Sequence, residues 1–208
     1  MFKKISMLAA AAMLSLGTAA SAATVFSDNF DNDLIGVPTA SLINWNVTVP
    51  SVDVIGSLGP GGPSFDFYPG NGNYLDMNGS TAPGSEGRIE TNALGLVLGK
   101  QYTLTFDYGA NSFPGLLPAL LTFGLGTDLI TLAINAIPAT LQQSLSYIFT
   151  YDGSGDYLSF ADTSGTDNDQ GGPVLDNVVL SAVPLPAGGL LLLGALGGFA
   201  ALRRRKTT

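Results

Sequence analysis

Carboxylates are the chemically versatile side chains of this sequence. Its 208 residues include 16 Asp and Glu, eight Lys and Arg, and neither His nor Cys. Without His and Cys, the chain has no Ser-His-Asp triad, no Cys-His dyad and no Cys/His zinc site. Two kinds of chemistry remain for the carboxylates. They can coordinate a hard cation such as Ca²⁺, or a pair of them can cleave a glycosidic bond by acid–base catalysis.

The acidic residues are concentrated in the middle of the chain. All 16 lie between Ala23 and Ala182 with only two basic residues, Arg88 and Lys100, so this segment has a formal charge of −14. Such a charge repels nucleic acid and anionic lipid, so neither is an expected partner. It suits either a bound divalent cation or simple solubility in a crowded matrix, and the composition leaves both open.

Glu86 and Glu90 are the only glutamates and the obvious candidates for a catalytic pair. A glycoside hydrolase needs two carboxyl groups about 5 to 10 Å apart. The segment Gly84–Thr91 is typical of a loop that leads into a strand, which disfavours such a pair. A hydrolase that uses distant Asp residues stays open.

A turn-rich loop between two tyrosines is the candidate ligand site. Tyr68 and Tyr74 flank this loop, where we expect them to be exposed and able to stack on a sugar ring. Polar side chains in the same loop can bind sugar hydroxyls, and they are Asn71, Asn73 and Asp76.

An oxygen-rich loop and the single tryptophan could also bind ligands, but structural roles explain both more simply. The segment Asp162–Gly172 is rich in oxygen ligands, with Asp167 and Asp169 alternating with short polar residues, but it lacks the glutamate and the spacing of an EF-hand. A solvated connection between strands is therefore favoured, because turns need the same residue types.

Trp45, the sole tryptophan, is expected in the core of the fold.

The elements that must position these residues are short β-strands. Runs rich in β-branched and aromatic residues alternate with clusters of Gly, Asn, Asp and Pro, which is typical of antiparallel strands joined by turns. The sequence predicts an all-β sandwich with strands at Thr24–Phe30, Trp45–Val49, Val52–Ile55, Tyr74–Met77, Arg88–Thr91, Tyr102–Tyr108, Leu120–Leu125, Leu129–Ile134, Leu141–Tyr151, Asp156–Ala161 and Val174–Ala182.

One stretch is more apolar than the rest. Phe113–Ile137 is rich in Leu and Ile but is interrupted by prolines and glycines, which favours two core strands or a buried hairpin over a membrane helix. The alternative is an edge that touches a membrane or a second copy of the chain.

Both ends of the chain have the composition of targeting segments. Residues 1–22 begin with Lys3 and Lys4, continue with an apolar run and end in small residues, which predicts a cleavable signal peptide. At the other end, the apolar run Leu185–Leu202 would extend roughly 27 Å as a helix, enough to span a membrane. The basic cluster after it would stay in the cytoplasm, which places the domain of residues 23–182 outside.

The C-terminal segment, residues 183–208, resembles the VPLPA variant of the PEP-CTERM sorting signal of Gram-negative bacteria. The resemblance rests on a motif, an apolar span and a terminal basic cluster in that order: Val183, Pro184, Leu185, Pro186 and Ala187, then Arg203, Arg204 and Arg205. It implies that an exosortase-type membrane enzyme recognises and processes the tail, and that the protein is sorted to the envelope or an extracellular matrix.

The middle segment resembles the galactose-binding-like jelly-roll modules of extracellular bacterial proteins. The resemblance rests on Val25–Asp31, Asn44–Val47, Gly70–Gly79 and Gly172–Leu180, in this order. It implies a two-sheet jelly roll, kinship with carbohydrate-binding modules, and a structural Ca²⁺ where the first strand meets the last. The positions that match the ion site are Asp28, Asp31 and Asp176.

The sequence therefore predicts a noncatalytic surface or matrix protein that binds extracellular polysaccharide and is itself a substrate of a processing enzyme. The alternative is a structural or adhesive subunit that associates with itself through the apolar stretch. A glycan hydrolase based on carboxylates is a third hypothesis, which the placement of the glutamates disfavours.

Overall fold

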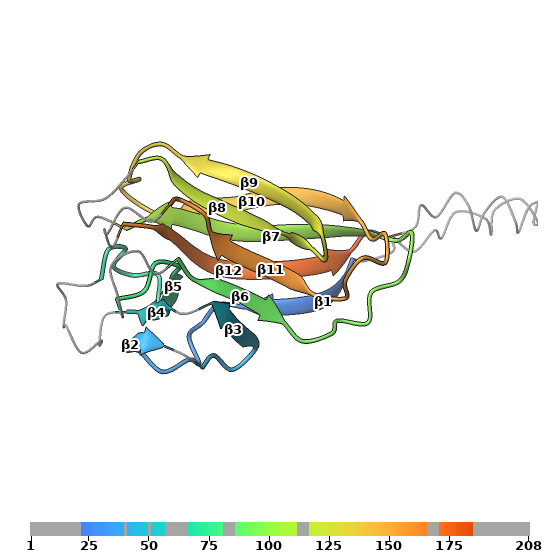
Figure 1. Ribbon diagram of the computed structural model, residues 1–208. Helices are drawn as coiled ribbons and strands as arrows, with labels where there is room; N and C mark the ends of the chain where they lie inside the picture. The colour runs from blue at the N-terminus through green and yellow to red at the C-terminus, as the bar shows by residue number, and fades with distance from the viewer. Residues whose placement is uncertain are drawn as a thin grey trace, which may run out of the picture. The chain divides into compact units, whose positions relative to one another are not determined.

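A computed structural model of the chain describes residues 22–39, 41–49, 51–56, 66–80, 86–111, 117–165 and 171–184. These residues form twelve β-strands and no helix (Figure 1). The strands are β1 (Ala23–Asp28), β2 (Gly36–Thr39), β3 (Trp45–Val49), β4 (Val52–Ile55), β5 (Tyr74–Asp76), β6 (Arg88–Thr91), β7 (Gln101–Ala110), β8 (Ala119–Leu125), β9 (Asp128–Ile134), β10 (Gln142–Thr150), β11 (Leu158–Asp162) and β12 (Pro173–Ala182). Thr24–Ala182 make up one compact unit.

The strands build two sheets that pack face to face (Figure 1). The seven-stranded sheet has the order β10-β7-β12-β5-β4-β2, and β1 also pairs with β12. The five-stranded sheet has the order β3-β6-β11-β8-β9. Neighbouring strands in both sheets pair antiparallel, for example β7 with β12 and β8 with β11. The predicted all-β sandwich of antiparallel sheets is therefore confirmed.

All eleven strands predicted from the sequence are present, with ends that differ by two residues or fewer. In β7, alternate side chains face the core, namely Tyr102, Leu104 and Phe106. β2 was not predicted from the sequence, and its four residues include a glycine and a proline. β2 lies at the edge of its sheet, where a proline costs no ladder hydrogen bond on the solvent side.

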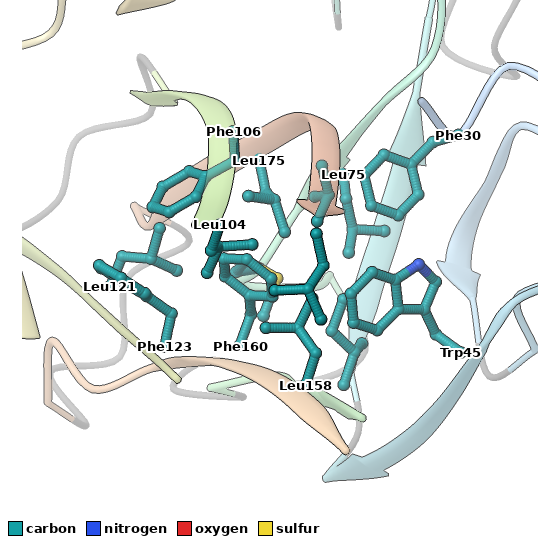
Figure 2. Close-up of a cluster of buried hydrophobic side chains, with 14 of the residues drawn as sticks. Phe30, Trp45, Leu75, Leu104, Phe106, Leu121, Phe123, Leu158, Phe160 and Leu175 are labelled. Carbon is teal, nitrogen blue, oxygen red and sulfur yellow. The ribbon is translucent and has the colours of Figure 1, made fainter. Parts of the chain in front are cut away.

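Aromatic side chains from both sheets interlock in the core (Figure 2). The ring of Phe160 lies 5.2 Å from that of Phe106 and 5.8 Å from that of Trp45, both edge-to-face. Phe123 packs 4.8 Å from Phe106 in the same way. Trp45 is only 4% exposed, so its predicted place in the core is confirmed.

The apolar stretch forms a hairpin of two strands, β8 and β9, in the part that the structure describes. Gly126 begins the two-residue turn with φ of 57°, a conformation that glycine adopts readily. β8 lies inside its sheet and buries Leu121 and Phe123, whereas β9 is an edge strand and Leu129 is 43% exposed. The prediction of two strands is confirmed, but only one of them is a core strand.

Candidate functional site

The acidic residues predicted to bind Ca²⁺ lie near the pairing of the first and last strands. Asp28 ends β1, Asp31 lies in the following turn, and Asp176 is in β12, the partner of β1. Asp176 is completely buried. Burial raises the pKa of its carboxyl to about 7, and the nearby carboxylates of Asp107, Asp31 and Asp28 act in the same direction. The three predicted residues therefore share one region.

The oxygens of Asp28 and Asp31 already accept hydrogen bonds within the protein. Trp45 donates its indole N–H to Asp28 Oδ2 at 2.8 Å, and the Phe30 backbone N–H donates to Asp28 Oδ1 at 3.0 Å. The Asn73 backbone N–H donates to Asp31 Oδ1 at 2.8 Å. Across the residues that the structure describes, no three acidic side chains gather closely enough to form a metal site from carboxylates alone. Ca²⁺ at Asp28, Asp31 and Asp176 stays a prediction.

The expectation that Tyr68 and Tyr74 are exposed is wrong. Tyr68 is 2% exposed and Tyr74 is completely buried, because their loop folds back against the outer side of β5 and β12. The Phe67 backbone N–H donates to the Tyr74 hydroxyl at 2.6 Å, and that hydroxyl donates to Asp66 Oδ1 at 3.0 Å. Burial raises the pKa of both tyrosines. Asp76 is also buried, so none of these three side chains lies where a glycan would stack.

The remaining predicted ligand residues lie at the surface with a second loop. Asn71 and Asn73 are half-buried, while Asn29 and Asp31 are exposed. We call these four residues the polar loop cluster. Asn29 Nδ2 donates to Asp31 Oδ2 at 2.6 Å, and Asn71 Nδ2 donates to the Tyr68 carbonyl at 2.8 Å. The Asn71 amide is thus fixed by the backbone of buried Tyr68, and the Asp31 carboxylate by the Asn29 amide and the Asn73 backbone.

A second polar group lies buried and combines residues of both sheets. We call Asp53, Asp76, Asn78 and Asp162 the buried acidic cluster. Asp53 on β4 and Asp76 on β5 are direct cross-strand partners, Asn78 follows β5, and Asp162 ends β11 in the other sheet. Each of the four is at most 3% exposed. Asp162 was predicted to begin a solvated loop, but it is buried in the last position of a strand; Asp167 and Asp169 lie outside the described residues.

Burial raises the pKa of all three carboxyls in this cluster. The pKa is raised to about 6 for Asp53 and for Asp162, and well above the ordinary range for Asp76. The carboxylates of Asp53 and Asp162 raise the pKa of Asp76 further. Hydrogen bonds act in the opposite direction: the Ser80 backbone N–H donates to Asp53 Oδ2 at 3.0 Å, and the Ser164 backbone N–H donates to Asp162 Oδ1 at 2.9 Å.

This cluster was not predicted from the sequence, although a signal for it was present. Asp53 is the second residue of Val-Asp-Val-Ile, and Asp76 lies between Leu75 and Met77. A charged residue inside so apolar a strand faces the sheet surface opposite the main core. On that surface, the neighbouring Ile55 and Tyr74 pack with Tyr68 in a second buried cluster.

The two glutamates have separate partners. Glu90 forms an ion pair with Arg88 at 2.8 Å, and Glu86 Oε1 accepts the Gly165 backbone N–H at 2.6 Å. In the sorting motif, Val183 and Pro184 follow β12, whereas Leu185, Pro186, Ala187 and the arginines lie outside the described residues, as does the predicted signal peptide up to residue 21. Among the described residues, no helix has the length and apolarity to span a membrane.

Comparison with known proteins identifies the fold. No known protein family and no curated protein matches the sequence. Among solved structures, an arabinose-bound MgGH51 α-L-arabinofuranosidase matches 79% of this chain with 15% sequence identity and a TM-score of 0.51. Two xylan-related proteins match less closely. One is the CBM22-1–GH10 part of endo-1,4-β-D-xylanase 10B of Clostridium thermocellum, which covers 80% of the chain with 12% identity and a TM-score of 0.46.

The other is the CBM22-1 xylan-binding domain of Xyn10C from Paenibacillus barcinonensis, with 80% of this chain and 100% of that domain covered, 17% identity and a TM-score of 0.41. The chain spans only 27% of the arabinofuranosidase and 30% of the xylanase. At such low identity, these likenesses concern the arrangement of the strands and no individual residue.

Proposed function

We propose that this chain is a noncatalytic surface or matrix protein whose β-sandwich binds extracellular polysaccharide through the polar loop cluster. The observation that carries this proposal is the pairing of two surface loops through Asp31, which accepts hydrogen bonds from Asn29 and from the Asn73 backbone at 2.6 and 2.8 Å. Exposed amides and carboxylates held in one arrangement are the groups that bind sugar hydroxyls with little loss of side-chain entropy.

The buried tyrosines contribute to the same proposal in a different role. Tyr68 and Tyr74 pack edge-to-face at 5.9 Å and hold the backbone of the loop that carries Asn71 and Asn73. They position polar groups and do not stack on the ligand. The likeness of the sandwich to part of an arabinose-bound enzyme is in keeping with a carbohydrate ligand.

The test is binding of the purified full chain to a panel of soluble and insoluble polysaccharides. We expect the double substitution Asn29→Ala and Asn71→Ala to weaken binding roughly tenfold or more, since it removes two amide donors. Asn135→Ala, at an exposed amide just after β9, serves as the matched control and keeps full affinity. Equal binding by the double variant and the parent chain would contradict the assignment of this surface.

The noncatalytic part of the proposal is supported by the placement of the two glutamates. Glu86 and Glu90 interact with different partners on different elements, which supports no shared acid–base role. Release of reducing ends from the same polysaccharide panel by the full chain would contradict it, and loss of that release in Glu90→Gln would assign the activity to Glu90.

Export and sorting are part of the same proposal and are supported by the sequence of the two ends. We expect the chain to reach the envelope or the matrix, with Val183–Ala187 recognised by the processing enzyme. Fractionation of cells that express the chain with Pro184→Ala and Pro186→Ala tests this: the altered chain accumulates unprocessed at the inner membrane. Normal release of that variant would remove the proposed role of the motif.

A second candidate function, self-association, is favoured by one specific observation. The edge strands β9 and β10 expose apolar side chains, with Leu129 at 43% and Ile148 at 62%. Exposed apolar edges are surfaces on which a second copy can pair. Oligomers that form as the protein concentration rises, and that added sugar does not change, would favour this function.

A further inference from the structure

The buried acidic cluster contains acceptor oxygens that lack any donor. Asp53 Oδ1, Asn78 Oδ1 and Asp162 Oδ2 are all inaccessible to solvent and have no hydrogen-bond partner among the described residues. A buried polar atom without a partner is rare in folded proteins, because it loses its hydration without compensation. Three such atoms in one cluster, all acceptors, share the same requirement for a positively charged or donating group.

One of these oxygens, Asp162 Oδ2, and the side chain of Asn78 lie against the same glycine. A Cβ atom placed on Gly172 would lie 3.0 Å from Asp162 Oδ2 and 2.5 Å from Asn78 Cβ. Asn78 is held there because its Nδ2 donates to the Gly171 carbonyl at 3.2 Å, which leaves its Oδ1 as the free end of the amide. Burial raises the pKa of the Asp162 carboxyl, and the Asn78 side chain lies close enough to offset part of that rise. The amide and the carboxylate therefore approach each other from two different sheets.

Among the described residues, no basic side chain balances the charge of the cluster. Between residues 23 and 182 the sequence has only Arg88 and Lys100. Arg88 is paired with Glu90 at 2.8 Å, and Lys100 is exposed beside the start of β7, where its carbonyl accepts the Tyr151 backbone N–H. Buried carboxylates are usually paired with a cation or coordinate a metal ion.

We propose that the buried acidic cluster is a divalent-cation site, in which Asn78 and Asp162 are the side-chain ligands and Asp53 and Asp76 supply further negative charge. The ligand atoms are all oxygens, which is the set that a hard cation such as Ca²⁺ requires. This mixed set of carboxylate and amide oxygens is consistent with the finding that no three acidic side chains among the described residues form a site by themselves. The ion joins β5 of one sheet to β11 of the other.

This site differs from the calcium site that the sequence predicted. The predicted residues Asp28, Asp31 and Asp176 belong to β1, the turn after it and β12, whereas the new cluster belongs to β4, β5, the residues after β5 and the end of β11. Substitutions can therefore distinguish the two sites.

The experiment is calorimetric titration of the purified, EGTA-treated full chain with CaCl₂ and, separately, MgCl₂. We expect Ca²⁺ binding that is weakened roughly tenfold or more by Asp162→Asn, because a charged ligand is lost. Asp176→Asn and the exposed Asp152→Asn are the matched controls, and both keep the binding event that Asp162→Asn weakens. Ca²⁺ binding that is lost in Asp176→Asn but unchanged in Asp162→Asn would overturn the proposal, as would no binding of either ion at millimolar concentration.

Thermal unfolding separates a lost ligand from a damaged fold. In EGTA, Asp162→Asn unfolds at the same temperature as the parent chain or higher, because it removes an uncompensated charge. In millimolar Ca²⁺ the midpoint of the parent chain rises by mass action and that of Asp162→Asn does not. If Asp162→Asn is less stable in EGTA, Asn78→Ala serves as the second variant, and an unchanged Ca²⁺ affinity in that variant would also overturn the proposal.

Discussion

The indole N–H of Trp45 donates a hydrogen bond of 2.8 Å to the carboxylate of Asp28, and this bond joins β3 of the five-stranded sheet to β1 of the seven-stranded sheet. The only tryptophan of the chain is also packed between Phe26 at 4.9 Å and Phe160 at 5.8 Å. Asp28 therefore has a structural role in closing the sandwich, whether or not it also binds an ion.

The first prediction concerns the energy of this bond. In a double-mutant cycle of Trp45→Phe and Asp28→Ala, we expect a coupling of about 1 to 2 kcal/mol in the free energy of unfolding, because the bond has a charged acceptor. Urea denaturation of the four proteins in EGTA provides the measurement. Val49→Ala, a 44% exposed position on the same strand, replaces Trp45→Phe in a control cycle that should be additive. Strict additivity of the first cycle would show that the bond contributes nothing.

The second prediction concerns the aromatic core. Phe160→Ala should lower the free energy of unfolding by about 3 to 5 kcal/mol, because the ring is completely buried and contacts aromatic side chains of both sheets. Ile148→Ala, at a position 62% exposed, should change it by about 0.5 kcal/mol or less. Urea denaturation measures both, and similar losses for the two would contradict the placement of Phe160.

The third prediction is a loss of stability with rising pH when divalent ions are removed. The pKa of Asp53 and Asp162 is raised to about 6 and that of Asp176 to about 7, above the ordinary value of 3.8. The folded protein holds these protons more tightly than the unfolded chain does, so stability is greatest near pH 4 and falls as the pH rises through 6 and 7. Asp53 and Asp162 each contribute up to about 3 kcal/mol to this fall, and Asp176 up to about 4 kcal/mol.

Urea denaturation in EDTA between pH 4.5 and 8 measures that dependence. Asp176→Asn should flatten it above pH 6, whereas the exposed Asp128→Asn should leave it unchanged. Stability that rises over this range in the parent chain would contradict the burial of the uncompensated carboxyls.

The fourth prediction concerns the exposed edges. If β10 is the surface of self-association, Ile148→Lys should abolish any oligomer that the full chain forms at high concentration, because a charge on an edge strand opposes pairing. Leu98→Lys, at a position 71% exposed outside the strands, is the control and should leave the oligomer intact. Sedimentation measures the molecular mass, and an oligomer that survives Ile148→Lys would exclude β10 from the interface.

The strands were predictable because hydrophobic alternation and turn residues act locally. β7 shows why: its buried residues follow a period of two from Tyr102 to Phe106, and no distant contact is needed to recognise them. β2 was not predictable for the opposite reason. Its Gly-Val-Pro-Thr sequence has weak strand propensity, and it pairs only because β4 is present beside it.

The functional residues were less predictable than the fold, because burial of a loop depends on distant contacts. Tyr68 and Tyr74 lie in a segment rich in turn residues, which normally indicates exposure. They are buried because the Tyr68 hydroxyl bonds to the backbone of Ala110, 42 positions away in the chain. The buried acidic cluster was missed similarly, since its members come from strands that only the tertiary fold brings together.

The position of β12 determines how the domain bears mechanical load. This strand ends at Ala182 and lies inside its sheet, paired antiparallel with β7 over eight positions and also with β5. A pull on the chain beyond Ala182 would act along β12 and would have to shear these hydrogen bonds together, since they lie across the direction of force. Under tension, the rate at which such a domain unfolds determines how long it stays folded, and its equilibrium stability does not.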